Sequence, residues 1–594
     1  MKRFIKTLVL TFVLASAGSV RAERWLLQND DLSFGGIQDL FIFVMFNGGT
    51  PLFDLFYPEE GFVAILADFP PGSPPALPAV GINGGTITGE LDIQLGPDAG
   101  GGGGGSSSWA VASLTTGASP VSPAPGFTKP TIYLPDTGVT LTHSDLIGST
   151  LNFLPGIAAA YDYNVDPLGL PLPPTPDSAS HGTAMASVIG GETCGILCPL
   201  QIQTNIVPVS IYDRLPSGNP DTNTWASTVL NAMLKIITDH RLRIAETPYT
   251  RNHASLVCFA HSTVGTAYRI GFLDTVMQRA WDAGITVVLS AGNRGILAGR
   301  VSPAAADWGY QPASGGPVYP PFTGNPTTTF VRDSTTLPIP LLPRFLVAGA
   351  SSLGGTAWSS SNTNNASGKV VDLLAPGVNV LAASNGGTSL IEGNGTSYSA
   401  GFVTAASALI AYTKPWATPD QIRAALVPQS VPEPPAPPPA LTLPQIASPA
   451  ISGITMTYAE WIAHYTKGIS SPLTGAGGDA TADPDGDSIP NLIEYYCGLD
   501  PKYSDTPSGP QISMDMTTRT LTLQLPRAIY LPTGTPPPQL QTSTTLESSS
   551  WTDVTPVLTE TQPVIEIGDG TEYTGTLTIP TGDRRFYRVA YPVP

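Results

Sequence analysis

The chain has 594 residues, and 41% of them are hydrophobic, so it is long enough for several folded units with sizeable cores. Only 12% are charged, and the formal net charge of −18 excludes nucleic acids and anionic membrane surfaces as expected partners. Glycine (62) and proline (61) are abundant, which favours turns and linkers over long helices.

The N-terminus has the pattern of a secretory signal peptide. Its first six residues carry three positive charges, and an apolar stretch follows from Leu8 to Ala17. The small-x-Ala sequence Val20–Ala22 predicts cleavage before Glu23. The alternative is an N-terminal membrane anchor, but the apolar stretch is short for a span. We therefore expect a secreted protein, extracellular or periplasmic, without membrane contact after cleavage.

Residues 23–99 contain apolar runs broken by Gly and Pro, which predict short strands. Phe41–Phe46 is a run of strand length. A Gly/Ser linker, Asp98–Ser108, separates this region from Trp109. Composition thus divides the chain into a signal peptide (1–22), an N-terminal region with its linker (23–108), a central domain (109–427), a Pro-rich linker (428–446), a helix with an acidic loop (447–504) and a C-terminal β domain (505–594).

The central domain alternates short apolar runs with helical stretches rich in small residues. Such strands are buried on both faces, so we expect an α/β fold with a mainly parallel sheet and helices on both sides. Beyond Pro501 the alternating pattern predicts a small β-sandwich. Expected strands are Thr131–Leu134, Ile206–Val209, Leu256–Phe259 and Ile285–Leu289, and expected helices are Ala226–Asp239, Leu273–Ala283, Ser397–Tyr412 and Tyr458–Tyr465.

Four polar residues in this domain occur in contexts suited to nucleophilic catalysis. Asp136 follows an apolar strand, where α/β sheets place ligands. His181 and Ser397 each open a helical stretch, and Asn293 lies between them in the chain. A hydroxyl needs an imidazole to take its proton, the imidazole needs a carboxylate, and the oxyanion needs a donor. His143 is a competing imidazole, which we interpret as a structural loop residue.

In this order and with these neighbours, the chain resembles the subtilisin-like serine proteases, the subtilase family, over roughly residues 109–425. Trp109-Ala110 and the strand into Asp136 resemble the proteinase K-like branch. The segments that carry the resemblance are Asp136-Thr137-Gly138, His181-Gly182-Thr183, Ala291-Gly292-Asn293, Ala375-Pro376-Gly377 and Gly395-Thr396-Ser397.

The resemblance implies an endopeptidase that cleaves polypeptides through an acyl-enzyme, with no metal in catalysis. Ser397 would be the nucleophile, and His181 the general base and then acid. Asp136 would orient His181, while Asn293 and the Ser397 backbone N–H would form the oxyanion hole. Residues 23–99 have the length of a subtilase propeptide, so we expect autocatalytic cleavage within or near the linker.

Some segments depart from the family pattern. Gly401 and Phe402 stand where the family often has Pro and His, and Ala184 and Met185 where it usually has His and Val. The substrate-lining strand, typically ending Ser-Leu-Gly, here reads Ala260-His261-Ser262. A Gly-, Pro- and Thr-rich insertion covers about residues 304–340. These departures leave the cleavage preference open, but not the chemistry.

An acidic loop near the C-terminus predicts a structural Ca²⁺ site, because this hard cation takes six to eight oxygen ligands. Ser488 stands where an EF-hand has glycine, so the loop instead resembles the Asp-rich repeats of secreted bacterial proteins. The alternative is a solvated acidic turn. The expected ligands are the side chains of Asp483, Asp485, Asp487, Asn491 and Glu494 and the carbonyl of Ile489.

Two other functions stay open. A sedolisin-type acid protease shares the fold, but it uses Glu and Asp where this chain has His181 and Asn293. A catalytically silent surface or adhesion protein would explain the two flanking regions. Cys194 and Cys198 lie four apart and are candidates for a disulfide in an oxidising compartment, whereas we expect a buried thiol at Cys258. The oligomeric state is not predicted.

Overall fold

The structure is a computed structural model of the chain. It describes residues 23–70, 75–92, 94–97, 100–101, 109–121, 129–159, 177, 180–212, 224–246, 254–263, 271–295, 345–364, 371–427, 438–443, 453–466, 475–499, 501, 510–528, 531–532, 535–545, 547–554, 559–561, 570–578 and 585–591. The predicted signal peptide and the insertion at about 304–340 lie outside this range.

Contacts divide the chain into two compact units, Met1–Ile93 and Gln94–Pro594. The first unit has a five-stranded antiparallel sheet in the order β2-β3-β1-β5-β4. One helix, α2 (Phe34–Phe46), packs on this sheet. The strands are β1 (Glu23–Asn29), β2 (Thr50–Tyr57), β3 (Phe62–Phe69), β4 (Ala79–Val80) and β5 (Thr86–Leu91).

The prediction of a strand at Phe41–Phe46 was wrong, because this run is the second half of α2. The Ser33 side chain accepts a hydrogen bond from the Gly35 N–H and caps the helix. Ile37, Leu40 and Val44 recur at helical spacing and are buried in the core of this unit. The run Phe41–Phe46 alone does not reveal this helical spacing, because the spacing begins at Ile37, before the run.

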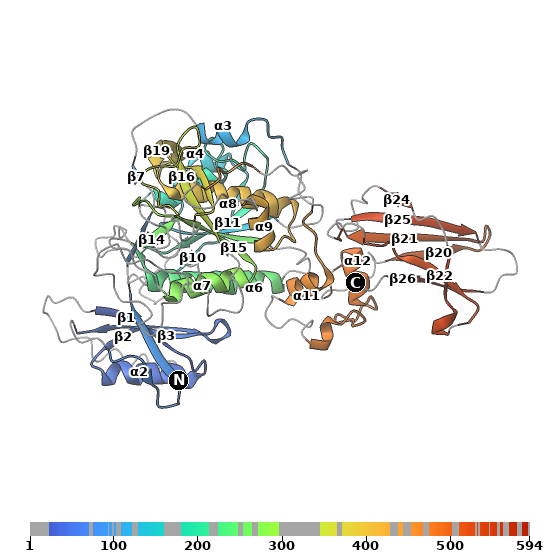
Figure 1. Cartoon of the computed structure of the whole chain (residues 1–594), viewed down its shortest axis with the longest axis horizontal. Coiled ribbons are helices and arrows are strands. Elements are labelled where there is room, and N and C mark those ends of the chain that lie inside the picture. Colours follow the sequence, from blue (N-terminus) through green and yellow to red (C-terminus); the bar gives the residue numbers. More distant parts are fainter. Residues whose placement is uncertain are drawn as a thin grey trace. The chain divides into compact units, whose positions relative to one another are not determined.

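The second unit is built on an eight-stranded sheet whose pairings are all parallel, in the order β10-β11-β8-β13-β15-β16-β17, with β9 paired to β11. This arrangement of a parallel sheet between helices confirms the predicted α/β fold class (Figure 1). The strands are β8 (Thr131–Asp136), β9 (Leu151–Phe153), β10 (Ile157–Ala158), β11 (Thr204–Ser210), β13 (Ser255–Phe259), β15 (Ile285–Ser290), β16 (Leu346–Ser351) and β17 (Leu373–Pro376).

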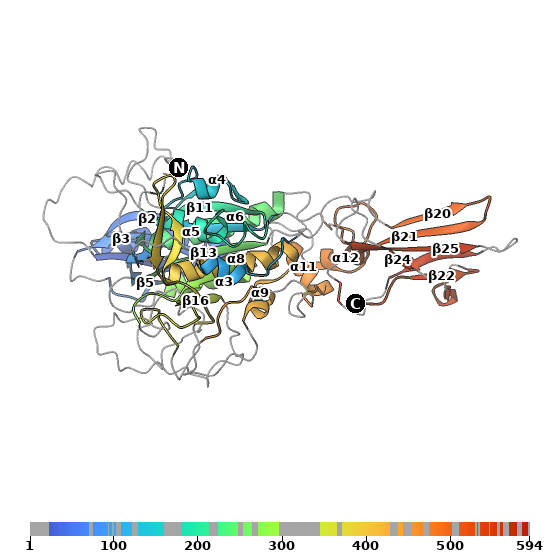
Figure 2. The same cartoon turned by 90° about the horizontal axis from the view of Figure 1, so that it is seen from above.

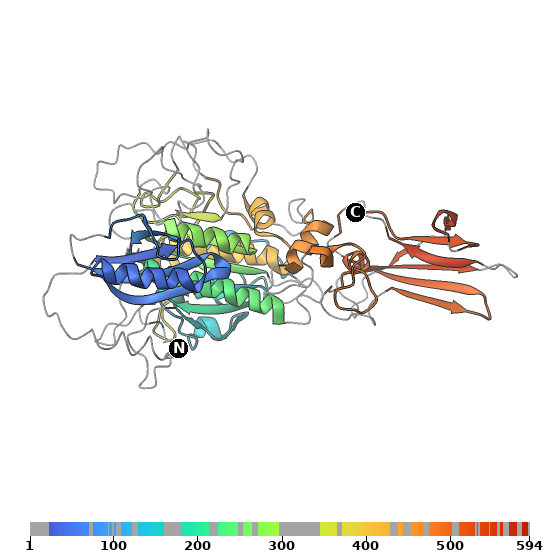
Figure 3. The same cartoon turned by 90° about the horizontal axis from the view of Figure 1, so that it is seen from below.

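Helices cover both faces of this sheet, and the central strands are therefore buried along their whole length. Two helices, α6 (Ala226–Glu246) and α7 (Gly271–Asp282), lie side by side on one face (Figure 3). On the other face, α5 (His181–Gly190) packs beside the long buried helix α8 (Thr396–Thr413), which crosses four strands (Figure 2). The remaining helices near this core are α3 (Trp109–Thr115), α4 (Ser144–Ile147) and α9 (Pro419–Leu426).

Two small three-stranded sheets flank the main sheet, and each includes a piece of the segment that precedes Trp109. One has the order β12-β6-β14 and the other β18-β19-β7. Part of the predicted Gly/Ser linker, at Gly100–Gly101, is therefore a paired strand. The strands are β6 (Gln94–Pro97), β7 (Gly100–Gly101), β12 (Thr224–Trp225), β14 (His261–Thr263), β18 (Val380–Ala383) and β19 (Leu390–Asn394).

The end of the Pro-rich segment is also tied to the core, since Ala440 bridges to Leu374 in β17. Two helices follow, α11 (Tyr458–Thr466) and α12 (Asn491–Cys497), and Trp461 and Tyr495 join them to the same apolar core. Within the described residues, none of the helices has both the length and the apolarity that a membrane crossing requires.

The C-terminal region forms the predicted β-sandwich from a four-stranded and a three-stranded antiparallel sheet. Leu521, Leu523 and Leu525 of one sheet pack with Leu540 of the other. The strands are β20 (Gln511–Asp515), β21 (Thr520–Ala528), β22 (Gln539–Ser543), β23 (Thr552–Val554), β24 (Thr559–Thr561), β25 (Gly570–Thr578) and β26 (Phe586–Ala590).

All four cysteines are unbridged in the structure, including the candidate pair Cys194 and Cys198. Cys194 is buried beside Asp145 and Ser187, whereas the sulfur of Cys198 lies 4.0 Å from the Gly148 carbonyl. Cys258 is a buried thiol, as predicted.

Candidate active site

Asp136 is the last residue of β8 and is fully buried. Its Oδ1 accepts hydrogen bonds from the Thr137 N–H, at 2.7 Å, and from the ring of His181. The strand ends at the carboxyl edge of the parallel sheet, where side chains from neighbouring strands converge. The position of the Asp136 carboxylate is therefore set by the sheet itself.

His181 is the first residue of α5, and its side chain reaches Asp136 and Ser397 in opposite directions. Its Nδ1 lies 2.8 Å from Asp136 Oδ1 and 2.9 Å from Oδ2. Gly182 allows the helix to begin here, since a Cβ at this position would lie 2.0 Å from the Gly138 carbonyl oxygen. The glycine after the histidine is thus required by close packing of α5 against the loop after β8.

Ser397 lies in the first turn of α8, and its Oγ is 3.1 Å from His181 Nε2. The hydroxyl also lies 3.1 Å from the Ala260 carbonyl oxygen, to which it can donate. Neither Asp136 nor Ser397 is exposed, and His181 is 8% exposed. The structure thus brings three of the predicted residues into one continuous chain of hydrogen bonds from carboxylate to imidazole to hydroxyl.

Asn293, the fourth predicted residue, is held beside this chain. Its Oδ1 accepts from both the backbone N–H and the hydroxyl of Thr396, at 2.9 Å each. Because the carbonyl end of the amide is engaged by the residue before Ser397, the Nδ2 end is oriented as a donor. A donor fixed this way suits an oxyanion that develops next to Ser397.

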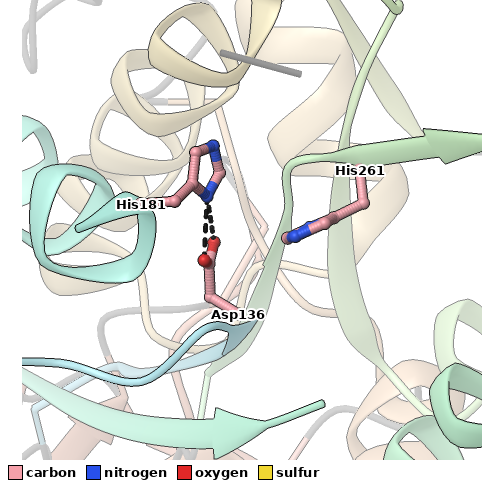
Figure 4. A group of neighbouring side chains, drawn as sticks. All are labelled: Asp136, His181 and His261. Atoms are coloured by element: carbon pink, nitrogen blue, oxygen red, sulfur yellow. Dashed lines mark hydrogen bonds and ion pairs between the residues drawn. The ribbon is translucent and has the colours of Figure 1, made fainter. Parts of the chain in front are cut away.

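A second histidine, His261, borders the site and was not singled out as a functional residue. It is fully buried, and its ring centroid is 5.3 Å from that of His181. Figure 4 shows its ring extending toward Asp136 and His181. Burial lowers the pKa of His261 to about 4, although the Asp136 carboxylate favours its protonated form. The ring is therefore neutral near neutral pH.

The ionisation of Asp136 follows from opposing effects. Burial by itself would raise its pKa. Two effects outweigh burial and hold the pKa of Asp136 below its usual value. One is the positive charge that His181 and His261 carry when they are protonated, and the other is the set of hydrogen bonds from His181 and the Thr137 N–H. The carboxylate therefore stays ionised under neutral conditions and can hold Nδ1 of His181 as the protonated nitrogen.

Asp177 is a supporting carboxylate that the sequence did not single out. Its Oδ1 accepts from the Thr137 hydroxyl at 2.7 Å, and its Oδ2 accepts from the Thr183 N–H at 2.7 Å. It thereby ties the residue after Asp136 to the first turn of α5. Burial raises the pKa of Asp177, against the hydrogen bonds that favour its charged form. A single Asp in a Pro-rich stretch gives no periodic signal that marks this position.

A segment of the chain itself pairs as an extended strand beside these residues. β6 lies antiparallel between β14 and β12, with Leu95 opposite both Thr263 and Thr224. In the same ladder, Pro97 is opposite His261, which follows Ala260 in the chain. A short way on, Gly100 of β7 pairs with Asn394, three residues before Ser397. Two paired pieces of one segment therefore flank Ser397.

The acidic loop lies apart from these residues in the sequence, before α12. Ligand oxygens of Asp483, Asp485 and Asp487 all lie within 4.8 Å of one another. Burial raises the pKa of Asp485 to about 6, and the nearby charges of Asp487 and Asp483 act in the same direction. Ser488 takes the positive φ of 76° that an EF-hand gives to glycine.

Of the three remaining predicted ligands, Ile489 precedes α12, and Asn491 and Glu494 lie in its first turn. Asn491 is fully buried, and its Oδ1 has no hydrogen-bond partner in the described part of the chain. Glu494 is also fully buried but does not belong to the group formed by the three aspartates. The structure thus brings three ligands together and places two more on the adjoining helix.

The sequence pattern of the subtilase family matches residues 128–450, more than half of the chain. The chain belongs to the subtilase family. This subtilase is 28% identical over 298 residues to an extracellular serine proteinase of Thermus sp. strain Rt41A, covering 50% of this chain and 53% of that protein. It is 24% identical over 260 residues to alkaline protease 1 of Aspergillus clavatus, covering 43% and 45%.

This subtilase spans about half the length of the curated relatives it matches. Among solved structures, it is similar to fervidolysin from Fervidobacterium pennivorans, a keratinolytic enzyme related to subtilisin. The identity is 18% and the TM-score 0.44, over 69% of this chain and 58% of that one.

Proposed function

We propose that this subtilase is a secreted serine endopeptidase in which Ser397 is the nucleophile. One observation carries the proposal, namely the buried chain of hydrogen bonds from Asp136 through His181 to Ser397. Ser397 Oγ attacks a peptide carbonyl while His181 Nε2 takes its proton, and the imidazolium then protonates the leaving amine. Water releases the acyl group through the same histidine. Throughout, Asp136 keeps the imidazole in the correct tautomer.

The oxyanion of each tetrahedral intermediate would lie between Asn293 Nδ2 and the Ser397 N–H. The engagement of Asn293 Oδ1 by Thr396 supports this, because it leaves the donor end of the amide for the substrate.

The test is hydrolysis of a denatured protein by purified wild type and Ser397→Ala. We expect the variant to lose hydrolysis while keeping the wild-type circular dichroism spectrum. Residual hydrolysis near the wild-type level would refute the assignment. An activity optimum near pH 4, with no rise toward neutral pH, would favour the acid protease. A folded wild type with no hydrolysis at any pH would favour the silent surface protein.

The pairing of β6 supports peptides as substrates. An extended segment between β12 and β14 has its backbone groups satisfied on both edges, as a bound peptide strand would. Leu95, which is fully buried there, marks a subsite for an apolar side chain. We infer that a substrate enters as a third strand in the same position, so its backbone supplies affinity and its alternate side chains supply specificity.

The same pairing supports self-cleavage of the precursor. The β6–β14 ladder ends with Pro97 opposite His261, the residue after Ala260, whose carbonyl accepts from Ser397 Oγ. The strand resumes on the other side of Ser397 at Gly100. Asp98 and Ala99 themselves lie outside the described residues. We propose that this protein cleaves itself between Pro97 and Gly100.

Mass spectrometry of the N-terminus tests self-cleavage. Wild type should begin at residue 98, 99 or 100, and Ser397→Ala should keep the segment from residue 23 to Pro97 after removal of the signal peptide. An active wild-type enzyme that still begins at Glu23 would contradict the proposal, and a different N-terminus shared by both proteins would assign the cut to another protease.

For the acidic loop we propose a structural Ca²⁺ site. Three carboxylates within reach of one ion support it, as does the buried Asn491 Oδ1, which accepts no hydrogen bond in the described residues. These oxygens fit a hard cation. Asp483, Asp485 and Asp487 would hold the ion, with Ile489, Asn491 and Glu494 as further ligands. The ion would neutralise the mutual repulsion of the three carboxylates and tie the loop to α12.

A further inference from the structure

His261 differs from the other buried histidines that the structure describes outside the catalytic group. Both ring nitrogens of His143 and both of His240 have hydrogen-bond partners. Neither nitrogen of His261 has one in the described part of the chain, although the side chain is completely buried. An imidazole with a buried, unsatisfied donor and acceptor is destabilising, so a ligand that engages it would be stabilising.

The ring of His261 is directed at the two groups that complete a metal-binding set. Ligand atoms of Asp136, His181 and His261 all lie within 4.8 Å of one another (Figure 4). Zinc binds imidazole and carboxylate at about 2.0–2.2 Å, which separates the ligands of a tetrahedral ion by roughly 3.3 Å. Closing the set would take a shift of the His261 ring by at most about 1.5 Å, and His181 Nδ1 and Asp136 Oδ1, which lie 2.8 Å apart, would have to separate by roughly 0.5 Å.

We propose that this subtilase binds one Zn²⁺ between Asp136, His181 and His261, with water as the fourth ligand. Imidazole and carboxylate are ligands that zinc accepts, whereas Ca²⁺ and Mg²⁺ prefer oxygen. The ion takes the place of the proton on His181 Nδ1, and that proton moves to Nε2 of the same ring, so the imidazole stays neutral.

Zinc in this position makes His181 unable to act as a base. With Nδ1 bound to the metal, the remaining ring proton is on Nε2, which then donates to Ser397 Oγ and cannot accept its proton. The site is a reversible off-switch for hydrolysis. This consequence rests on the proposed function, but the binding itself does not.

Binding is measured on the full-length Ser397→Ala protein, which makes the result independent of hydrolysis. Millimolar Ca²⁺ is present to occupy the acidic loop, and Zn²⁺ affinity is determined by competition with a chromogenic chelator. We expect one Zn²⁺ per chain. Co²⁺ in place of Zn²⁺ should give the intense visible absorption of a tetrahedral site. Absence of both signals would overturn the proposal without any substitution at His261.

The ligand set is tested by adding His261→Leu to the Ser397→Ala protein. The variant removes the ring nitrogens but keeps an apolar side chain, and affinity for Zn²⁺ should fall by on the order of tenfold or more. Tyr212→Phe is the matched control, since the Tyr212 ring packs 5.6 Å from that of His261. The control should bind Zn²⁺ as the parent does. Equal affinity in all three proteins would place the ion elsewhere and refute the assignment.

The off-switch is tested on proteins with Ser397 intact. Each protein is compared with its own zinc-free rate, and zinc should inhibit wild type and Tyr212→Phe but not His261→Leu. Addition of a chelator should restore the rate. Zinc that binds Ser397→Ala with the predicted dependence on His261, yet inhibits no active protein, would overturn the switch and leave the binding site. If no protein hydrolyses substrate, the proposed function fails instead.

Discussion

The lowered pKa of Asp136 decides which group of the site responds to mild acid. Its pKa lies below the usual value, so its carboxylate is ionised throughout the neutral and mildly acidic range. The stability that this ionised form contributes is present above the pKa of an unfolded Asp, and it is lost as the pH falls through the lower, folded pKa. We therefore expect a loss of activity in mild acid to come from the imidazole of His181 and not from Asp136.

We expect kcat/KM to rise with pH through the range in which imidazole loses its proton, and to be recovered on return from about pH 5. The measurement is a pH–rate profile with circular dichroism recorded on the same samples. A fall in activity that coincides with loss of the circular dichroism signal would show that unfolding is the cause.

Asn293→Ala tests the oxyanion assignment. The substitution removes the donor directed at the substrate, and we expect kcat to fall by about 10²–10³ with little change in KM. This magnitude is taken from subtilisin and not from this chain. Thermal unfolding is the control, because Asn293 Oδ1 also accepts from Thr396. A rise in KM with kcat unchanged would mean that Asn293 only binds the ground state.

The three residues of the proposed catalytic group could be predicted from the sequence, but the residues that contact and support them could not. Asp136, His181 and Ser397 each occupy a recognisable position at a strand end or a helix start. Asp177 and His261 act through three-dimensional contacts, with Thr137 and Thr183 in one case and with His181 in the other. Neither contact leaves a spacing pattern in the chain.

At the scale of elements, β6 belongs by sequence to one region of the chain and by its strand pairing to another. Its residues belong to the region expected to be a propeptide with its linker, yet the strand pairs inside the second unit. The central strands were predictable because runs buried on both faces are continuous in sequence. The strands β6 and β7 could not be predicted, because they form by pairing with strands that are distant in the chain. The helix α2 was missed because its helical spacing of apolar residues begins before the apolar run.

Leu95→Asp tests β6 as the strand that presents the bond for cleavage. A carboxylate at this buried position would be desolvated without a counter-charge, so the strand should leave its place and self-cleavage should slow by at least tenfold. Gln94→Glu is the control, since Gln94 is only partly buried and should tolerate the charge. The measurement is the rate at which the precursor is converted, by mass spectrometry. Equal rates in the two variants would contradict the role of β6.

At the scale of the whole molecule, the acidic loop lies between the peptidase core and the β-sandwich in the chain. Helices α11 and α12 share an apolar core with the peptidase region, whereas the loop itself rests on clustered carboxylates. Without a cation these carboxylates repel one another, and burial raises the pKa of Asp485 to about 6. Ca²⁺ should therefore stabilise this segment selectively, since an ion that binds only the folded state stabilises it.

Chelation should increase proteolytic nicking between about residues 470 and 500, while covalent labelling of Ser397 persists. The reason is that the ion orders the loop, whereas the proposed chemistry uses no metal. Limited proteolysis of wild type and Asp485→Ala/Asp487→Ala, each with and without chelator, measures the effect. The double variant should be nicked in both conditions. If chelator left wild type unchanged and the double variant matched it, the loop would be only an acidic turn.

The most direct measurement is labelling with a fluorophosphonate, followed by mass spectrometry of the peptides. The probe reacts only with a hydroxyl that a neighbouring base activates, so it reports on Ser397 and His181 together. We predict a single adduct per chain, on Ser397, that is absent in Ser397→Ala and strongly slowed in His181→Ala. An adduct on another residue, or equal labelling of wild type and His181→Ala, would contradict the account.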